Sequence, residues 1–245
     1  MRIGAPVLAF ESLESTNKMA AELFGLSKVQ HGAVIMANEQ TAGRGQRDRV
    51  WVAQKGADLT VSVVLEPPGL RAEDQFVLSK LAALAVSDVV RTWIGGPVAV
   101  KWPNDVLVGR RKIAGILIEN DVMGERVACS VVGIGINVNS SGFPEDLMAT
   151  SMLLESGGRV DLTDVLTDLC GALDKRWQAW VAGDAQAEDY ASALWAKGRW
   201  VAMVLDGVPV TARPMEVDRH GRLIVELEGG AVNAYSLDQL RFAPR

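Results

Sequence analysis

The chain has little cysteine, few aromatic residues and no excess of positive charge. Its 245 residues include two cysteines, Cys129 and Cys170, whose spacing fits neither a disulfide framework nor a metal site. The formal net charge is −5, which argues against nucleic acid or an anionic membrane as partner, because neutralising phosphates requires a basic face. We therefore expect a cytoplasmic protein with reduced thiols that binds neither DNA nor a membrane.

Long hydrophobic runs are also missing. The first residues carry one basic side chain but no apolar stretch typical of a signal peptide. The longest uncharged window, residues 127–144, contains Ser, Asn and Gly and ends at Pro144, which makes it a poor membrane span. A hydrophobic content of 49% with 22% charged residues instead fits a globular protein with a sizeable core.

Strand and helix patterns mix along residues 1–197. Ser15 stands before a helical pattern that ends at Gly25, and residues 73–94 predict the longest helix. Together the patterns predict an α+β fold, a mixed or antiparallel sheet with packed helices, rather than a doubly wound sheet. Residues 6–10 form a short apolar run. Strands are predicted at residues 33–37, 59–65, 98–102, 106–108, 113–119 and 127–138, and further helices at 162–181, capped by Asp161, and at 187–197.

The texture changes near Gly198. From residue 200 to the end, short β-type runs are separated by turn signals at 206–207, 220–221 and 229–230. This pattern predicts a small β-barrel or sandwich. We therefore expect two domains, residues 1–197 and residues 198–245.

The stretch GRGQRDR, residues 43–49, is the clearest chemical signal. Gly43 and Gly45 let the backbone approach a ligand closely, while Arg44, Arg47 and Arg49 offer cationic forks for carboxylate or phosphate oxygens. The alternative is a solvated basic turn. The segment by itself does not decide between them.

Three other segments carry polar residues that a simple core would not need. Residues 15–17, Ser-Thr-Asn, stand at a helix start, where they serve either as caps or as ligand contacts. Lys112 opens an apolar strand and either meets a phosphoryl group or snorkels to solvent. The segment GIGINVN, residues 133–139, has glycines that permit close packing against a flat ligand, but it is neither a dinucleotide fingerprint nor a P-loop.

Taken in order, these segments resemble the biotin protein ligases. The resemblance rests on six motifs: ESTN at 14–17, EQTAGRG at 39–45, RVW at 49–51, KWPND at 101–105, RKIAGILIE at 111–119 and GIGINVN at 133–139. It implies a catalytic domain of the biotin/lipoate ligase type with a C-terminal SH3-like barrel. It also implies ATP and Mg²⁺ as cofactors, biotin as substrate, a biotinyl-5′-AMP intermediate, and a carboxylase's biotin carboxyl carrier domain as acceptor.

The resemblance also assigns roles to residues by motif position. The catalytic residues it implies are Lys112, Arg44, Arg47 and Arg49. The biotin-binding residues it implies are Ser15, Thr16, Asn17, Gln40, Gly43, Arg44, Gly45, Gln46, Lys112, Gly115, Leu117 and Gly133. The nucleotide-binding residues it implies are Arg47, Arg49, Trp51, Asn104, Asp105 and Asn137, with Asp105 also a candidate Mg²⁺ ligand.

The chain departs from the family pattern at two points. The family's loop commonly runs GRGRRGR, and Gln46 and Asp48 here replace an arginine and a glycine, so we expect weaker retention of the adenylate. The first motif begins at Glu14, which leads us to expect a short form without an N-terminal DNA-binding domain.

Two other functions remain open at this point. A lipoate ligase shares the fold and the adenylate chemistry, and a non-catalytic sensor of biotin or an adenylate would keep only the binding site. An exposed sheet edge near the site would suit either an acceptor hairpin or a homodimer, and the sequence does not choose between them.

Overall fold

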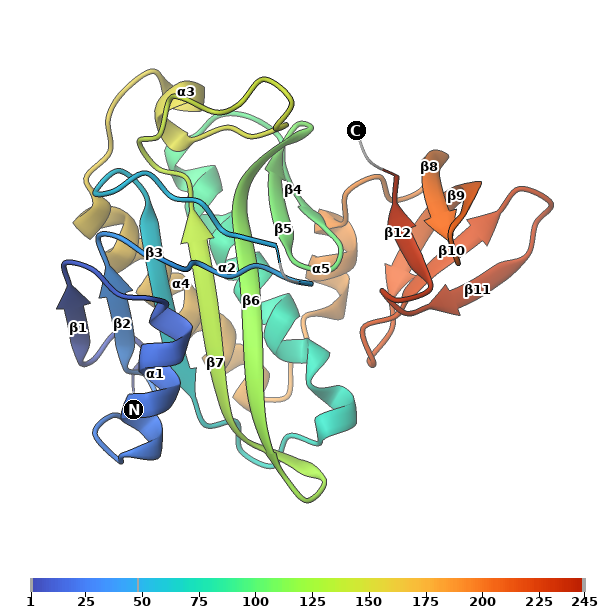
Figure 1. The fold of residues 1–245 in the computed structure, drawn as a ribbon. Helices are drawn as coiled ribbons and strands as arrows, with labels where there is room; N and C mark the ends of the chain where they lie inside the picture. The colour runs from blue at the N-terminus through green and yellow to red at the C-terminus, as the bar shows by residue number, and fades with distance from the viewer. Residues whose placement is uncertain (1, 48, 244–245) are drawn as a thin grey trace.

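The computed structural model describes residues 2–47 and 49–243 and contains two β-sheets. The larger sheet has seven strands in the order β1-β2-β3-β7-β6-β5-β4, and the smaller has five in the order β11-β10-β9-β8-β12 (Figure 1). The larger sheet is mixed, because β1 and β2 pair in parallel while every other pair of neighbouring strands in this sheet is antiparallel. Its strands are β1 (Val7–Phe10), β2 (Val34–Ala37), β3 (Leu59–Leu65), β4 (Val98–Lys101), β5 (Asp105–Val108), β6 (Arg111–Met123) and β7 (Arg126–Ile136).

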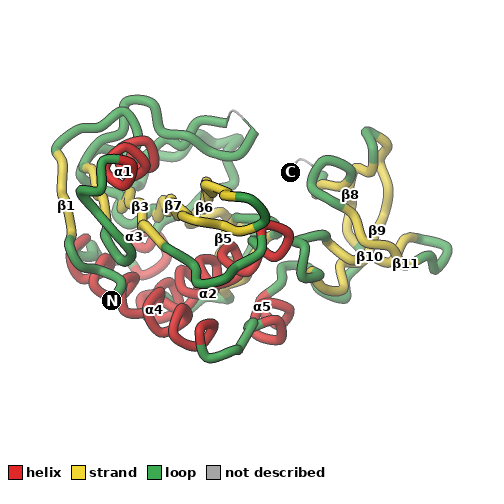
Figure 2. Tube along the Cα trace, turned by 90° about the horizontal axis from the view of Figure 1, so that it is seen from below, coloured by secondary structure: helices red, strands yellow, loops and turns green. Residues whose placement is uncertain are grey.

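Helices cover both faces of this sheet. Figure 2 shows α2 and α4 on one side and α1 on the other. The main core lies beneath α2 and α4, and a smaller cluster of buried residues packs under α1. The helices are α1 (Thr16–Gly25), the 3₁₀ turn η1 (Ala72–Asp74), α2 (Phe76–Trp93), α3 (Met152–Ser156), α4 (Leu162–Val181) and α5 (Ala187–Ala193).

The alternation of β3 shows how the sequence divides the two faces. Leu59, Val61 and Val63 join the main core, while Thr60 and Ser62 point to the opposite face. Both polar side chains are buried, at 3% and 0% exposure. Over residues 59–63, β3 is therefore apolar on the face toward the main core and polar on the opposite face.

The smaller sheet is antiparallel and forms the C-terminal β-barrel, which packs against the part of the protein built from the larger sheet and its helices. Trp102 Nε1 donates to the Gly221 carbonyl at 2.9 Å, and Lys80 Nζ reaches the Val217 carbonyl at 3.4 Å. The main core continues into this sheet through Met203, Leu223 and other buried residues. Its strands are β8 (Val201–Leu205), β9 (Val208–Val217), β10 (Leu223–Leu227), β11 (Val232–Tyr235) and β12 (Leu240–Phe242).

The predicted α+β fold class is confirmed, with corrections to single elements. The helix predicted at 73–94 begins only at Phe76, since Glu73 and Asp74 form a separate 3₁₀ turn, so α4 with 20 residues exceeds α2 with 18. The helix predicted at 187–197 ends at Ala193, because Leu194 then pairs with Val100 of β4. The sequence patterns did not predict strand β12 or helix α3. The domain boundary at residue 198 stays a prediction.

Two predicted caps differ in outcome. Asp161 accepts a hydrogen bond from the Thr163 N–H at 2.7 Å, as a helix cap should. Ser15 occupies the cap position of α1, but among the described residues its side chain accepts no capping bond. The predicted cap position of Ser15 is therefore confirmed, but not a capping hydrogen bond from its side chain.

No helix among the described residues is long and apolar enough to cross a lipid bilayer.

Candidate functional site

Strand register places glycines on the polar face of the larger sheet. Gly133 of β7 lies opposite Ser62 of β3 and Leu117 of β6. Two residues farther along β7, Gly135 lies opposite Thr60 of β3 and Gly115 of β6. These two rows are about 7 Å apart, two residues along a strand. Gly115, Gly133 and Gly135 thus make a flat floor, which we call the glycine floor.

A hydrogen-bonded network of buried side chains stands at one end of this floor. The Ser62 hydroxyl lies 2.8 Å from Thr16 Oγ1 and 2.6 Å from Asn17 Oδ1. Gln40 Oε1 accepts from both the Thr16 amide and its hydroxyl, at 2.8 and 3.1 Å. Because Ser15, Thr16 and Asn17 are each at most 6% exposed, this end of the floor is neutral, polar and largely desolvated.

Glu119 joins that network to the Gly/Arg loop, residues 43–49. Its carboxylate accepts from Asn17 Nδ2 at 2.8 Å and from the Arg44 guanidinium at 2.9 and 3.0 Å. Asn17 Nδ2 also lies 3.3 Å from the Leu117 carbonyl, so the amide orientation is fixed on both sides. Arg44 is thereby held beside the neutral end of the floor.

Lys112 and Asp105 form an ion pair at the other end. Lys112 Nζ lies 2.6 Å from Asp105 Oδ1, with the two side chains 34% and 22% exposed. Asp105 pairs in register with Gly115, which brings the carboxylate to the edge of the floor. The Lys112 backbone is bonded to Met148 and Thr150, so its position is fixed from the next segment as well.

Trp51 covers the glycine floor between these two ends. A Cβ added at Gly135 would overlap the indole ring, and one at Gly115 would lie 3.0 Å from both the ring and Lys112 Nζ. Lys112 Nζ stands 5.3 Å from the ring centroid, within the range of a cation–π contact. The indole N–H is buried without a hydrogen-bond partner among the described residues. A ligand on this part of the floor must therefore displace the indole.

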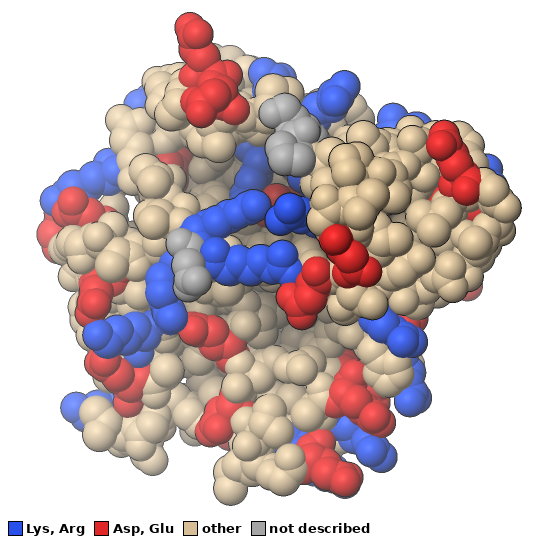
Figure 3. Space-filling model, turned by 45° about the vertical axis from the view of Figure 1, so that its right-hand side comes forward, with Lys and Arg blue, Asp and Glu red and all other residues tan. Residues whose placement is uncertain are grey.

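The Gly/Arg loop crosses the polar face as a hairpin-like turn. Arg44 bridges Val50, and the Gly45 N–H donates to the Arg49 carbonyl at 2.6 Å. Gly43 has no room for a side chain, since a Cβ there would overlap the Trp51 carbonyl. Figure 3 shows Lys and Arg side chains gathered across a hollow on this face, with acidic side chains at its margin.

Arg47 and Arg49 have different surroundings. Arg47, at a positive φ of 55°, donates to the Leu237 carbonyl at 2.6 Å and to Asp238 at 2.7 Å, both in the second sheet's domain. The Arg49 side chain is exposed and makes no ion pair with the described residues. Gln46 is partly buried. Asp48 lies outside the described residues, so our expectation for that substitution stays a prediction.

Two predicted nucleotide contacts are occupied by backbone partners. Asn104 Nδ2 donates to the Ile116 carbonyl at 2.8 Å, which pins the KWPND turn onto β6. Asn137 is 5% exposed and donates to the Thr150 carbonyl at 2.9 Å. In this arrangement both amides hold loops in place, and their nucleotide roles stay predictions.

Ser62 and Glu119 lie in the site but were not predicted from the sequence, whereas Gly135 is one of the glycines of the GIGINVN segment that were expected to pack against a flat ligand. Ser62 had a signal, because Thr60 and Ser62 are the polar residues of an otherwise apolar strand and share one face. Glu119 stood in a motif without an assigned role, and its contact with Arg44 joins residues 75 positions apart. Such a contact depends on the register of β6 and is not visible in a linear pattern.

The site's residues fit Mg²⁺ only as an ion carried by a substrate. No group of three His, Cys, Asp or Glu residues that suits a metal occurs within residues 2–47 and 49–243. One oxygen of Asp105 is engaged by Lys112. Since Mg²⁺ commonly keeps its waters and binds through one or two carboxylates plus substrate phosphates, Asp105 would contact it through the other oxygen.

Comparisons with known proteins point to one family. A model described as the biotin/lipoate A/B protein ligase family matches residues 9–137. The bifunctional ligase/repressor BirA of Bacillus subtilis is 32% identical over 246 residues, covering 96% of this chain and 74% of that protein. The biotin–[acetyl-CoA-carboxylase] ligase of Paracoccus denitrificans is 37% identical and covers 85% of each chain.

Solved structures show the same fold. The biotin protein ligase from Aquifex aeolicus in complex with biotin and ATP superposes with a TM-score of 0.82 at 24% identity, covering 98% of this chain and 100% of that one. The matched family model spans more than half of the sequence, and relatives above 30% identity align over most of it. The chain therefore belongs to the biotin/lipoate A/B protein ligase family, and it is a biotin–protein ligase.

Proposed function

We propose that this enzyme activates biotin as biotinyl-5′-AMP and transfers the biotinyl group to a lysine of a biotin carboxyl carrier domain. In the first step a biotin carboxylate oxygen bonds to the α-phosphorus of ATP, and the bond to pyrophosphate breaks. In the second step the acceptor amine attacks the carbonyl carbon of the mixed anhydride and loses a proton. AMP leaves with the electron pair of the broken bond.

The observation that carries this proposal is the polarity of the two ends of the glycine floor. Biotin has a neutral ureido ring, with one carbonyl and two N–H groups, and a carboxylate at the end of an alkyl chain. The end around Thr16, Asn17, Gln40 and Ser62 offers neutral donors and acceptors, while the other end offers Lys112. We assign the ureido ring to the first end and the carboxylate to the second.

Cations at the second end would let two anions approach each other. A carboxylate and a triphosphate repel, so fixed positive groups are needed where they meet. Removing one such preorganised donor costs about 3–4 kcal/mol in comparable sites. Lys112 is held by Asp105, and Arg49 is exposed within the Gly/Arg loop. We assign Lys112 to the reacting oxygens and Arg47 and Arg49 to the phosphates.

Trp51 suggests how the site changes on loading. Because the indole lies on Gly135 and its N–H is unpaired, displacement by biotin would break no hydrogen bond of that N–H with the described residues. The ring would then be free to cover the nucleotide, in keeping with its predicted role. Both cysteines are free thiols, which supports the cytoplasm as the compartment.

The first half of the proposal is tested by pyrophosphate exchange. Labelled pyrophosphate should enter ATP when biotin is present, and not with lipoate or octanoate. Lys112→Ala should abolish this exchange, whereas Lys175→Ala, the same substitution at an exposed position of α4, should leave it unchanged. Exchange supported by lipoate would reassign the substrate. Tight biotin binding without exchange would indicate a sensor.

A further inference from the structure

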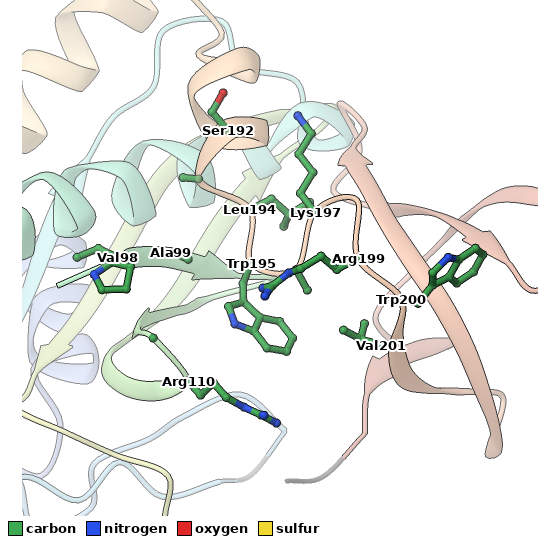
Figure 4. A pocket seen from close by; sticks show the side chains of 14 residues that line it. Val98, Ala99, Arg110, Ser192, Leu194, Trp195, Lys197, Arg199, Trp200 and Val201 are labelled. Carbon is green, nitrogen blue, oxygen red and sulfur yellow. The ribbon is translucent and has the colours of Figure 1, made fainter.

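A recess lies where the larger sheet and its helices join the C-terminal barrel. It has a volume of about 700 Å³ and is lined by the start of β4, the β5–β6 turn and residues 192–201. Figure 4 shows Trp195 and Arg199 side by side, Arg110 below them on the β5–β6 turn, Lys197 extending away from them, and Trp200 farther off beside the barrel strands. Within residues 2–47 and 49–243, the hydrogen bonds and the ion pair described above around the glycine floor involve other residues.

The recess is positive in a protein that is negative overall. Its described lining residues include three cations, Arg110, Lys197 and Arg199, and no Asp or Glu. The whole chain has a formal charge of −5. Clustering of cations against this background favours an acidic partner, because complementary charge speeds encounter and fixes orientation.

Its side chains are of the types that dominate protein–protein contacts. Trp200 is 46% exposed, and the Arg213 guanidinium stands 5.2 Å from its ring centroid. Arg199 stands 5.9 Å from the ring of Trp195 in the same way. Tryptophan and arginine are the residues most enriched at the energetic centres of interfaces. Small-ligand sites usually bury most of their ligand, whereas this recess is only partly enclosed, which favours a protein segment over a small molecule.

The position suits the second half-reaction. Arg110 lies in the turn between β5 and β6, two residues before Lys112 of β6. A partner seated in the recess would therefore have its edge near the cationic end of the glycine floor. The outer edge of β4 at this point is already closed, since the Val100 carbonyl accepts from the Trp195 N–H at 2.7 Å. Docking here must rest on side chains rather than on strand addition.

We propose that this recess is the docking surface for the acceptor carrier domain, which presents carboxylates beside its acceptor lysine. The inference rests on the proposed function and adds to it where the acceptor binds. Lys197 and Arg199 supply the charge, and Trp195 and Trp200 the apolar contact area. Adenylate formation does not involve the recess.

The test separates the two half-reactions. The double variant Lys197→Glu/Arg199→Glu should raise the KM for a purified carrier domain about tenfold at low salt, an effect that shrinks as salt screens the charges. Its biotin-dependent pyrophosphate exchange, and release of its adenylate by hydroxylamine, should stay within about twofold of wild type, as expected of charges remote from the chemistry. The variant Lys28→Glu/Lys175→Glu makes the same change in net charge at exposed positions away from the recess and should behave as wild type.

Each outcome is decisive. An unchanged carrier KM in the recess variant would overturn the docking proposal, as would an equal loss in both half-reactions. An equal rise in KM in the control variant would reduce the effect to net charge and also overturn it. Failure of the wild-type enzyme to exchange pyrophosphate with biotin would count against the proposed function instead.

Discussion

Replacing Gly133 by alanine perturbs the neutral end of the glycine floor by a single methyl group. The new Cβ would overlap Asn17 Oδ1 and would lie 3.0 Å from the Leu117 carbonyl. Because the Leu117 carbonyl belongs to a paired strand, Asn17 must move. Its bonds to Ser62 at 2.6 Å and to Glu119 at 2.8 Å are then broken or stretched.

The expected size follows from overpacking. Inserting a methyl group into a filled site costs about 1–3 kcal/mol, and each lost hydrogen bond contributes about 0.5–1.5 kcal/mol of that range. If Asn17 takes up the displacement, the dissociation constant for biotin should rise by about 5- to 150-fold, the same energy expressed as a ratio. The free energy of unfolding should fall by a similar 1–3 kcal/mol, roughly, which leaves a folded protein.

Isothermal titration of biotin, with urea unfolding alongside, measures both quantities. Gly142→Ala is the matched control, because a Cβ there meets no atom within 4 Å and the residue is exposed. Its biotin affinity should equal that of wild type. A Gly133→Ala protein that binds biotin within twofold of wild type would refute the reasoning that Asn17 forms part of the binding site.

Three further predictions concern separate parts of the molecule. Asp105→Asn removes the charged partner of Lys112 at nearly constant side-chain size, so pyrophosphate exchange should slow about tenfold. The free energy of unfolding should change by under about 1 kcal/mol. An unchanged exchange rate would exclude a role of Asp105 in positioning Lys112. Burial raises the pKa of the Cys129 thiol to about 12, so iodoacetamide at about pH 8 should label it only after unfolding; rapid labelling of the native protein would contradict this. Burial lowers the pKa of His31, which stacks on Trp177, below 6.5. The unfolded chain then binds the proton more readily, so unfolding free energies should fall as pH drops below about 6.5, and His31→Gln should flatten this slope in urea titrations; an equal slope would contradict the assignment.

The sequence anticipated elements whose signals are local. Strand β3 and helix α4 begin and end at the predicted residues, because an apolar run bounded by turn residues and a capped amphipathic pattern depend on neighbours in the chain. The predicted start of α2 was wrong because Glu73 and Asp74 form a separate 3₁₀ turn, and the predicted end of α5 was wrong because Leu194 pairs with Val100 of β4.

Site geometry was predictable only in part. The motifs named most of the residues that surround the glycine floor, and alternation explains why Thr60 and Ser62 share its face. The row that joins Gly115, Gly135 and Asp105 depends on the register of three strands and cannot be derived from any one of them. The contact of Arg47 with Leu237 spans 190 positions, and no periodic pattern carries such information.

The most direct test of biotin transfer is mass spectrometry of a purified biotin carboxyl carrier domain after incubation with the enzyme, biotin and ATP. We predict one biotinyl group on one lysine, formed only when biotin and ATP are both present and not formed by Lys112→Ala. A carrier domain that stays unmodified while the enzyme forms biotinyl-5′-AMP and releases it would contradict the proposed transfer.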